Sequence, residues 1–284
     1  MTVQVRTATL EDAAAWDAFV QTEPTATFFH RFGWKTVLET AFGHRTHFLL
    51  AEEHGCILGV LPLGEIKSRL FGHSLISTPF CVYGGIAAAH PAAYAALDAQ
   101  AQTLAIQLGV GHLEYRDRDL DAHEDWPGTD LYVTFRKPID LDVEQNMLAI
   151  PRKQRAMVRK GIKNGLTAEL ESGVDGFFHV FSDNVHRHGT PSLPKRFFAL
   201  LREVFGPDCE VQLVRSAEGE LISGVLSFYF RDEVLPYYAG DMESARGLAA
   251  NDFKYWELMR RACERGCKVF DYGVFPTNKA WLPS

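Results

Sequence analysis

The two halves of the sequence repeat one order of short motifs, and this repeat limits the folds that the chain can adopt. Three segments of the first half have counterparts, in the same order, in the second half: Gly59-Val60-Leu61 and Gly224-Val225-Leu226, Tyr83-Gly84-Gly85 and Tyr238-Ala239-Gly240, and Leu113-Glu114-Tyr115 and Phe270-Asp271-Tyr272. The last two segments each follow a glycine, Gly109 or Gly266, at the same spacing. Three matches in order favour an internal duplication, which predicts two similar domains.

Each half is expected to form the same succession of helices and strands. Apolar periodicity, glycine turns and capping residues predict two helices, an antiparallel run of strands, a further helix and a closing strand. For the first half the expected strands are residues 3–6, 47–52, 56–66, 75–86 and 112–115, and the expected helices are 10–22, 33–42 and 91–109. For the second half the expected strands are 210–215, 221–230, 234–241 and 268–272, and the expected helices are 175–188, 195–205 and 252–265.

This order of elements is that of the acetyltransferase (GNAT) fold, in which a splayed pair of parallel strands accepts an acyl donor. The expected fold class is therefore α/β (α+β), with two tandem GNAT-like domains whose mixed central sheets are flanked by helices. A β-like run at 131–138 gives way to Pro151 and a helix of different composition, which places the boundary between Ile139 and Pro151. We expect an N-terminal GNAT-like domain at 1–145, a C-terminal GNAT-like (BioF2-like acetyltransferase) domain at 146–273 and an irregular tail at 274–284.

Charge and cysteine usage exclude several classes of protein. The net charge of −7 argues against a general nucleic-acid binder, because phosphate neutralisation needs clustered cations, and DNA is not an expected partner. The five cysteines lack any metal-binding spacing, so we expect buried free thiols and no metal site. The N-terminus has no apolar segment behind a basic start, and no stretch is long enough to span a bilayer. We expect a cytoplasmic protein, with peripheral membrane association left open.

The segment from Pro151 to Lys163 is the most distinctive in the chain, because six cations fall within twelve residues. On a helix, Arg152, Arg155 and Arg159 share one face, and Lys160 lies beside them. Arginine forks suit phosphate oxygens, so this stripe is a candidate site for an anionic substrate, a nucleotide diphosphate, a lipid phosphate or a tRNA backbone. The alternative is a solvated helix face without a ligand.

The segment 243–252 joins the tyrosine-rich strand to the next expected helix and is a candidate site for an acyl donor. In coenzyme A users, such a loop wraps the pyrophosphate with backbone N–H groups at a helix N-terminus. Four residues are candidates for donor binding: Arg246, Gly247, Ala249 and Asn251. The alternative is a glycine-containing loop that Asn251 or Asp252 merely caps.

Other polar and aromatic residues form a second group of candidates. Tyr238 could orient substrate or donate a proton at the end of its strand, and Asp241 could accept one. His188 could act as a base beside Arg187, a candidate substrate contact, although a loop histidine is more often only exposed. In the first half, Trp34 and Tyr83 are candidate substrate contacts, with a role in the domain core as the alternative for the aromatic segment around Trp34.

Taken together, these segments resemble the FemAB-type family, and more narrowly its members associated with exosortase/PEP-CTERM and exopolysaccharide systems. The resemblance covers nearly the whole chain and depends on the following motifs: FFHRFGW, TPFCVYGG, PRKQRAMVRKGIKNG, HRHGTP, ELISGVLSFYF, LPYYAGD and KVFDYG. It implies transfer of an acyl or aminoacyl group to an amine of a cell-envelope or exopolysaccharide-related precursor, such as a glycan or peptide. The donor would be a co-substrate, aminoacyl-tRNA or acyl-CoA, with no permanently bound cofactor.

One departure from the family concerns the C-terminal end. Relatives continue after the FDYG-like strand with a glycine-rich segment and a Phe-Lys pair, whereas here Gly273 is followed by eleven residues that include two prolines. On this basis we expect a second domain that is incomplete at its C-terminal end, with activity impaired. The alternatives are therefore an inactive GNAT-like module that binds an anionic envelope precursor or partner, and a simple acetyl-CoA-dependent N-acetyltransferase.

Overall fold

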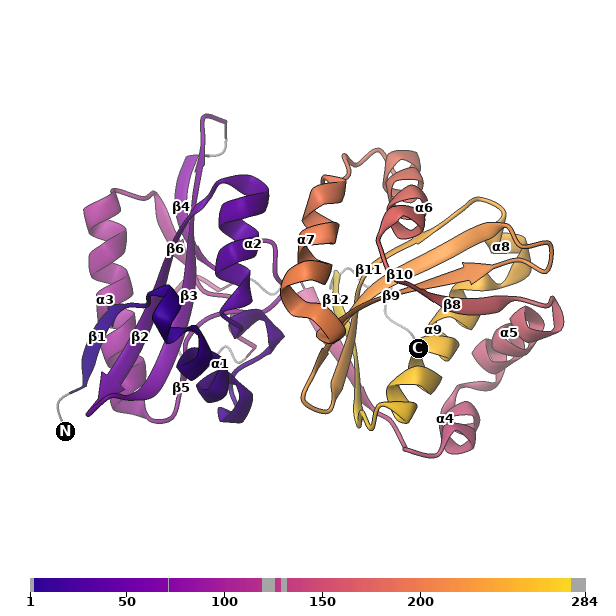
Figure 1. Cartoon of the computed structure of the whole chain (residues 1–284), viewed down its shortest axis with the longest axis horizontal. Coiled ribbons are helices and arrows are strands. Elements are labelled where there is room, and N and C mark those ends of the chain that lie inside the picture. Colours follow the sequence, from indigo (N-terminus) through magenta and orange to yellow (C-terminus); the bar gives the residue numbers. More distant parts are fainter. Residues whose placement is uncertain (1–2, 71, 119–125, 129–131, 277–284) are drawn as a thin grey trace. The chain divides into compact units, whose positions relative to one another are not determined.

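A computed structural model describes residues 3–70, 72–118, 126–128 and 132–276 of the 284-residue chain (Figure 1). The chain divides into two compact units, Met1–Gly128 and Thr129–Ser284, which are treated separately below.

The first unit is built on one mixed sheet. Its elements are β1 (Gln4–Thr7), the 3-10 helix η1 (Leu10–Asp12), α1 (Ala13–Thr22), the 3-10 helix η2 (Phe28–His30), α2 (Gly33–Phe42), β2 (Arg45–Glu53), β3 (Cys56–Ser68), β4 (Gly72–Ser77), β5 (Ala87–Ala88), α3 (Pro91–Leu108) and β6 (His112–Glu114). The strand order is β1-β2-β3-β4-β6, and the short β5 also pairs with β3. β4 and β6 are parallel, and the other neighbours are antiparallel.

The second unit repeats this arrangement with additions. Its elements are β7 (Tyr132–Pro138), α4 (Val143–Ala149), α5 (Arg152–Lys163), β8 (Thr167–Glu171), α6 (Asp175–Arg187), α7 (Lys195–Phe205), the 3-10 helix η4 (Gly206–Asp208), β9 (Cys209–Arg215), β10 (Leu221–Phe230), β11 (Glu233–Asp241), α8 (Ala245–Leu248), α9 (Ala250–Glu264) and β12 (Val269–Pro276). The strand order is β7-β12-β11-β10-β9-β8, in which β11 and β12 are parallel.

The predicted fold class is confirmed by this topology. The order β1-β2-β3-β4-β6 of the first sheet corresponds to β8-β9-β10-β11-β12 of the second, and in both units a long helix precedes the last of these strands. Two of the three motif matches hold in the structure. Gly59 and Gly224 lie on the corresponding strands β3 and β10, and Leu113 and Phe270 lie on the corresponding strands β6 and β12.

The expected strand at 75–86 is wrong beyond Ser77. Thr78 and Phe80 have φ angles of 46° and 67°, a left-handed conformation that no strand contains, and Pro79 between them has no N–H to donate. Tyr83-Gly84-Gly85 therefore follows β4 in an irregular segment and is not the counterpart of a strand segment in the second unit.

Two further expectations about the domains need correction. The β-like run at 131–138 is expected in the first domain. It forms β7 instead, and the backbone of β7 pairs with β12 in the second sheet. The tail was expected to be irregular from residue 274. β12 instead continues to Pro276, with Val274 and Phe275 paired to Thr134 and Val133. The remainder of that expected tail, 277–284, lies outside the described residues.

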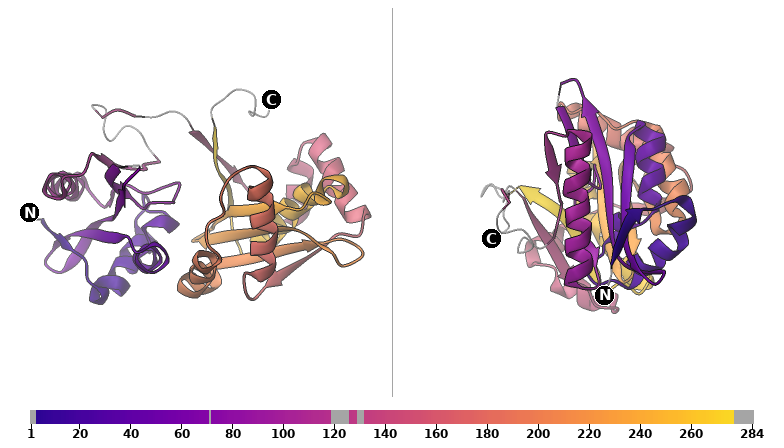
Figure 2. Two further views of the ribbon diagram at one scale, coloured as in Figure 1. Left: turned by 90° about the horizontal axis from the view of Figure 1, so that it is seen from above. Right: turned by 90° about the vertical axis from the view of Figure 1, so that its left-hand side faces the viewer.

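Helices cover both faces of each sheet (Figures 1 and 2). In the first unit, α3 packs Ala93, Leu97 and Ala101 against one face of the sheet, opposite leucines of β2, β3 and β4. On the other face, α1 and α2 enclose an aromatic core of fully or nearly fully buried side chains: Trp16, Phe28, Phe29, Phe32, Trp34 and Phe48. Such burial of apolar area is the main stabilising contribution to the unit.

In the second unit, α6 and α7 cover one face of the sheet and α9 covers the other (Figure 2). Phe177, Phe181 and Phe198 form the aromatic packing between α6 and α7, with ring centroids 5.1–5.5 Å apart. On the opposite face, α9 packs Leu258, Met259 and other apolar side chains against β10 and β12. The helix α5 packs on α9 and carries the cationic residues of the chain's most distinctive segment.

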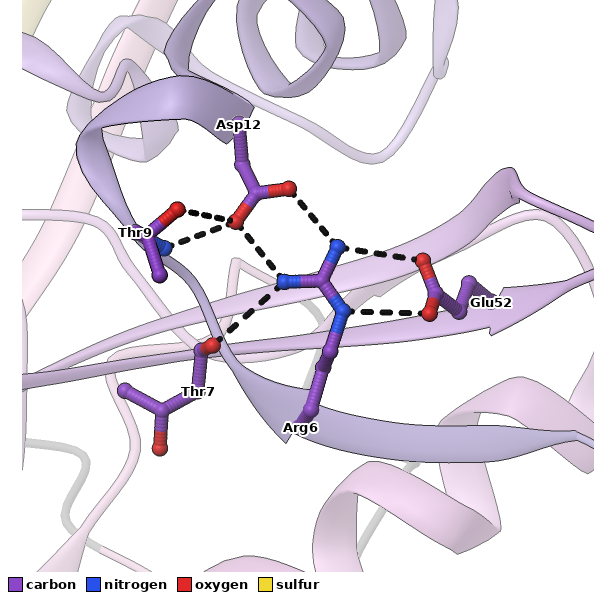
Figure 3. A network of polar contacts seen from close by, with 5 residues as sticks. All are labelled: Arg6, Thr7, Thr9, Asp12 and Glu52. Carbon is purple, nitrogen blue, oxygen red and sulfur yellow. Dashed lines mark hydrogen bonds and ion pairs between the residues drawn. The ribbon is translucent and has the colours of Figure 1, made fainter.

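A polar network fixes the start of the first unit (Figure 3). The guanidinium of Arg6 in β1 donates to both carboxylate oxygens of Asp12, each at 2.7 Å, and to Glu52 of β2 at 3.0 Å. The backbone N–H of Thr9 donates to Asp12 at 2.7 Å. The hydrogen bonds from Arg6 hold the pKa of Asp12 well below its usual value. The network thereby ties β1, η1 and β2 together.

Candidate functional site

The candidate site lies in the second unit, where two parallel strands part. β11 and β12 pair at only two positions, Glu233 with Val269 and Val234 with Phe270. Beyond them, β11 continues beside β10 as far as Asp241, while β12 pairs with β7 (Figure 1). The two strands therefore diverge after these pairs, and the chain that leaves β11 leads to the start of α9.

β11 also carries a bulge in this stretch. Leu226 of β10 pairs with Tyr238, but the next residue of β10, Ser227, pairs with Pro236, so Tyr237 is the extra residue. A bulge leaves its extra residue outside the ladder and re-aims neighbouring side chains, and bulges are frequent beside active sites.

A pocket of about 410 Å³ lies where β11 ends, and we call it the loop pocket. Its lining comes from α5, the end of α6, the end of β11, the segment containing α8 and the first turn of α9: Met157, Asn184, Arg187, His188, Asp241, Met242, Glu243, Ala245, Arg246, Ala249, Ala250, Asn251 and Asp252. Six candidates that the sequence scattered over 65 positions thus meet in one place: Arg187, His188, Asp241, Arg246, Ala249 and Asn251. Gly247 lies in α8 beside them but does not line the pocket.

Asp241 is held from behind the pocket wall by two side chains. The ammonium of Lys254, in α9, lies 3.0 Å from Oδ1 of Asp241, and the hydroxyl of Ser223, in β10, donates to the same oxygen. Lys254 is 1% exposed, whereas the side chain of Asp241 is 32% exposed. Burial lowers the pKa of Lys254, and the Asp241 carboxylate opposes that shift. Within the described residues, Oδ2 of Asp241 has no hydrogen-bond partner, so it is available to a ligand.

The end of α6 brings two side chains to the pocket, Arg187 and His188, which differ in their partners. Arg187 donates from Nε to Asp183 at 2.8 Å and from Nη2 to the backbone oxygen of Asp241. Its charge is therefore paired, and its position braces the end of β11. His188 follows the last residue of α6 and is exposed at the pocket wall, where its imidazole can reach a ligand.

The start of α9 is formed differently from the expectation. Ala249 is the N-cap residue with a φ of 61°, and no side chain caps the helix. The expected cap at Asn251 or Asp252 is wrong, because both residues lie inside the first turn. Burial raises the pKa of Asp252. Asn164 donates to the backbone oxygen of Leu248 at 3.1 Å, which ties this segment to the end of α5.

A second pocket, of about 600 Å³, follows the cationic face of α5, and we call it the basic cleft. Its lining includes all four cations predicted for the anion site and one more: Arg152, Arg155, Arg159, Lys160 and Lys163. None of the five forms an ion pair with any residue that the structure describes. Arg155 also donates to the backbone oxygen of Ile150 at 3.1 Å, where α4 ends. A surface of unpaired cations is suited to an anionic ligand.

Comparison with known proteins decides the fold. The crystal structure of FemX superposes with a TM-score of 0.72 over 97% of this chain and 89% of that chain, at 16% identity. A tandem GNAT protein from the clavulanic acid biosynthesis pathway gives a TM-score of 0.61 over 98% of this chain and 91% of that chain, at 11% identity. This is the tandem GNAT fold. Residues 152–279 also match the family model for the acetyltransferase (GNAT) domain.

One curated relative connects the fold with a particular transfer reaction. The UDP-N-acetylmuramoylpentapeptide-lysine N(6)-alanyltransferase of Weissella viridescens is 23% identical over 137 residues, which are 46% of this chain and 40% of that protein. The match thus spans about two fifths of the relative's length.

Besides Gly247, three predicted residues lie in neither pocket: Trp34, Tyr83 and Tyr238. Trp34 is fully buried and donates its indole N–H to the backbone oxygen of Phe28, so the expectation that it contacts substrate is wrong. Tyr83 is 3% exposed and its ring packs against Phe29, which makes it a core residue as well. Tyr238 turns toward α6 and α7, where its ring centroid lies 5.2 Å from that of Phe198.

The sequence prediction missed both residues that hold Asp241, Ser223 and Lys254, and the less expected of them is Lys254. It stands in an otherwise amphipathic helix, where a lysine is usually assigned to the solvent face. The internal repeat could have identified it. Aligning Gly109 with Gly266 places Leu97, a fully buried core residue of α3, at the position of Lys254. A lysine at a core position of a duplicated helix is unusual unless it has a partner.

Three other properties bear on the expected chemistry. Among the described residues, no three His, Cys, Asp or Glu side chains are grouped so that they could hold a metal ion. No helix within the described ranges is both long and apolar enough to cross a membrane. Four of the five cysteines are buried and free as expected, whereas Cys56 is exposed, because it lies at the first position of β3 beside a turn.

Proposed function

We propose that the chain transfers an acyl group, preferentially an aminoacyl group, to a primary amine, and that the loop pocket is the place of transfer. One observation carries the proposal. The pocket lies at the end of β11, after the divergence from β12, and it joins Asp241 and His188 with the start of α9. In the GNAT fold, this divergence of parallel strands is where the acyl donor is expected.

The distribution of charge favours aminoacyl-tRNA over acyl-CoA as donor. The basic cleft offers five cations without acidic partners among the described residues, which suits a chain of phosphates. The loop pocket instead contains three carboxylates, from Asp241, Glu243 and Asp252, and is a poorer place for a pyrophosphate. Support also comes from the partial similarity to an alanyltransferase.

The chemistry that these residues can perform is direct transfer. The amine nitrogen attacks the ester carbonyl of the donor, the carbonyl carbon becomes tetrahedral, and the C–O bond to the leaving hydroxyl breaks as the amide forms. Asp241 or His188 accepts the proton that the amine loses and returns it to the leaving oxygen, which departs as a hydroxyl. No covalent enzyme intermediate is needed, so positioning supplies much of the rate.

The acceptor that we propose is an amine of a cell-envelope precursor. The curated relative transfers alanine to the lysine N(6) of UDP-N-acetylmuramoylpentapeptide, as its name states. The exopolysaccharide-related and exosortase/PEP-CTERM-linked acceptors inferred from the sequence motifs remain within this proposal as narrower candidates.

The test compares two donors and two variants of α5. We expect transfer to a lysine-containing peptidoglycan precursor from alanyl-tRNA and little from acetyl-CoA. Arg159→Ala removes a cation of the basic cleft. It is expected to raise KM for the tRNA and to reduce the slope of log KM against log salt by about one. Lys153→Ala removes an exposed cation of the same helix that does not line the cleft, and it is expected to leave both quantities unchanged.

The outcomes separate the proposal from its alternatives. Transfer from acetyl-CoA alone would replace the aminoacyl proposal with the simple acetyltransferase that the matched GNAT domain model favours. Binding of tRNA or precursor without transfer from either donor would mean that the chain is a binding module. Equal effects of Arg159→Ala and Lys153→Ala would remove the basic cleft from the donor site.

A further inference from the structure

Asp241 differs from the other acidic residues of the loop pocket in the way it is held. Glu243 and Asp252 also line the pocket, but neither has an ionic partner among the described residues. Asp241 is fixed through one oxygen, because Oδ1 accepts hydrogen bonds from Lys254 and Ser223. The lysine is buried at the core side of α9, so the carboxylate cannot rotate without leaving an ammonium unpaired in the core.

The two carboxylate oxygens of Asp241 are held differently, because Oδ1 is bound by two buried side chains, Ser223 and Lys254. Oδ2 has no partner in the part of the chain that the structure describes, and the Asp241 side chain is 32% exposed at the pocket wall. An oxygen that is fixed in place and unoccupied loses little entropy when it binds a ligand. The group best matched to it is a charged N–H donor.

The remaining charges of the pocket favour a cation over an anion. Lys254 is paired with Asp241, and Arg187 is paired with Asp183. What remains among the lining residues is the pair of carboxylates of Glu243 and Asp252 against the single guanidinium of Arg246. Phosphate would be repelled by this excess of negative charge, whereas a primary ammonium group would be attracted.

We propose that Asp241 is a specificity-determining residue that binds a primary ammonium group of the substrate through Oδ2, and that Lys254 and Ser223 are positioning residues that hold Oδ1. The inference depends on the proposed function, because it takes the loop pocket as the place of transfer. Two groups of the substrates could supply this primary ammonium: the α-amino group of an aminoacyl donor and the side-chain amine of the acceptor. In either case, the amine-bearing form binds and its N-acetylated form is rejected.

The test uses two matched pairs of probes with the full-length chain. For the donor, the probes are adenosine carrying alanine in a stable 3′-amide linkage and the same compound with its α-amino group acetylated. For the acceptor, they are N-acetyllysine amide with a free and with an acetylated side-chain amine. Dissociation constants are measured by calorimetry. In the wild type, we expect the free amine of at least one pair to bind about 10- to 100-fold more tightly, the range of a charge-assisted hydrogen bond.

Two variants separate the carboxylate from the lysine behind it. Asp241→Asn combined with Lys254→Met removes both charges, leaves no unpaired charge in the core and is expected to reduce the preference to less than about twofold. Lys254→Met alone keeps the carboxylate but removes one of the two groups that hold Oδ1, so the preference is expected to persist at a size between those of the wild type and the double variant. Glu220→Gln removes an exposed carboxylate of the turn before β10 and serves as the control for the change in net charge.

Two results would overturn the inference: no preference in either probe pair for the wild type, or a preference that survives in the double variant. Because the probes measure binding and need no turnover, the two proposals can fail separately. Absence of transfer from every donor would refute the proposed function and leave a measured ammonium preference intact. Transfer with no ammonium preference would refute only the role of Asp241.

Discussion

Replacing Lys254 by methionine tests whether the buried ion pair stabilises the second unit or costs it stability. The lysine is 1% exposed, and within the described part of the chain its ammonium has one hydrogen-bond acceptor, Oδ1 of Asp241, at 3.0 Å. Burial lowers its pKa in spite of the neighbouring carboxylate, which means that the fold disfavours the charged form relative to water. Methionine has a similar length and no charge, while Asp241 remains hydrated through the pocket. At pH 7 we therefore expect Lys254→Met to be at least as stable as the wild type.

The size of the effect depends on pH with a sign that follows from linkage. Between the lowered pKa of Lys254 and its ordinary value of 10.5, the unfolded chain binds the proton that the folded chain releases. Wild-type stability therefore rises with pH over this range, by at most about 1.4 kcal/mol per pH unit for one proton. The variant lacks this contribution. The stability of Lys254→Met relative to the wild type should consequently fall as the pH approaches 10.5. Tyrosines and cysteines that titrate in the same pH range are present in both proteins, so their contributions cancel in this difference.

The assay is urea denaturation of both proteins at pH 7, 8, 9 and 10, followed by circular dichroism and tryptophan fluorescence. Lys153→Met is the control, because it makes the same substitution at an exposed position of α5 and should give a difference independent of pH. A Lys254→Met protein that is less stable by about 3–5 kcal/mol at pH 7 would contradict the reasoning, since that is the usual cost of breaking a favourable buried pair. A constant difference across the pH series would contradict it as well.

Two other perturbations test the packing around the site and the first sheet. Gly161→Ala should destabilise the chain by about 1–2 kcal/mol in urea denaturation. The Cβ of the new alanine would lie 2.8 Å from Cβ of Phe253, and this crowding outweighs the gain in helix propensity. A stabilised variant would mean that α5 can move away from α9. In the first unit, burial alone would raise the pKa of Glu65, but hydrogen bonds from His47 and His73 outweigh it and lower the pKa. This stabilisation is present above the ordinary pKa of 4.5 and is lost as the pH falls below it. The wild type should therefore be more stable than Glu65→Gln in urea denaturation at pH 6, and this difference should narrow by pH 3. An equal difference at both pH values would refute the reasoning.

The fold could be predicted from the sequence because two independent patterns agree on it. Local periodicity placed helices such as Gly33–Phe42 and Lys195–Phe205 at their observed bounds, and the repeat supplied the topology. Long-range pairing could not be read in the same way. The local sequence at 131–138 predicts a strand but not the sheet to which the strand belongs. Its pairing with β12 places it in the second sheet. The partner is 130 or more residues away in sequence, so no local pattern contains that information.

The sequence predicted several residues of the candidate site, but it did not predict how they are arranged around one pocket. Asp241, His188 and Arg246 were identified by residue type near the ends of elements, and the structure places them around one pocket. The predictions for Trp34 and Tyr83 were wrong because an aromatic side chain satisfies a core position as well as a binding site, and the burial of both residues places them in the core. Lys254 was missed for the opposite reason, because lysine is so rarely a core residue that a helix position is assigned to solvent by default.

The proposed site lies where the second unit departs from its duplicate. Through the pairs Leu75 with Leu113 and Val234 with Phe270, Ser77 at the end of β4 corresponds to Pro236 in β11. β11 continues to Asp241, and this extension, which carries the bulge and the carboxylate, has no strand counterpart in the first unit. The core position that holds leucine in α3 holds lysine in α9. Extending the strand and replacing the leucine are useful only together, because the lysine needs the carboxylate as a partner and the carboxylate needs a fixed position. Their joint presence in one copy assigns the loop pocket of the second unit, and no equivalent place in the first, as the site of transfer that we propose.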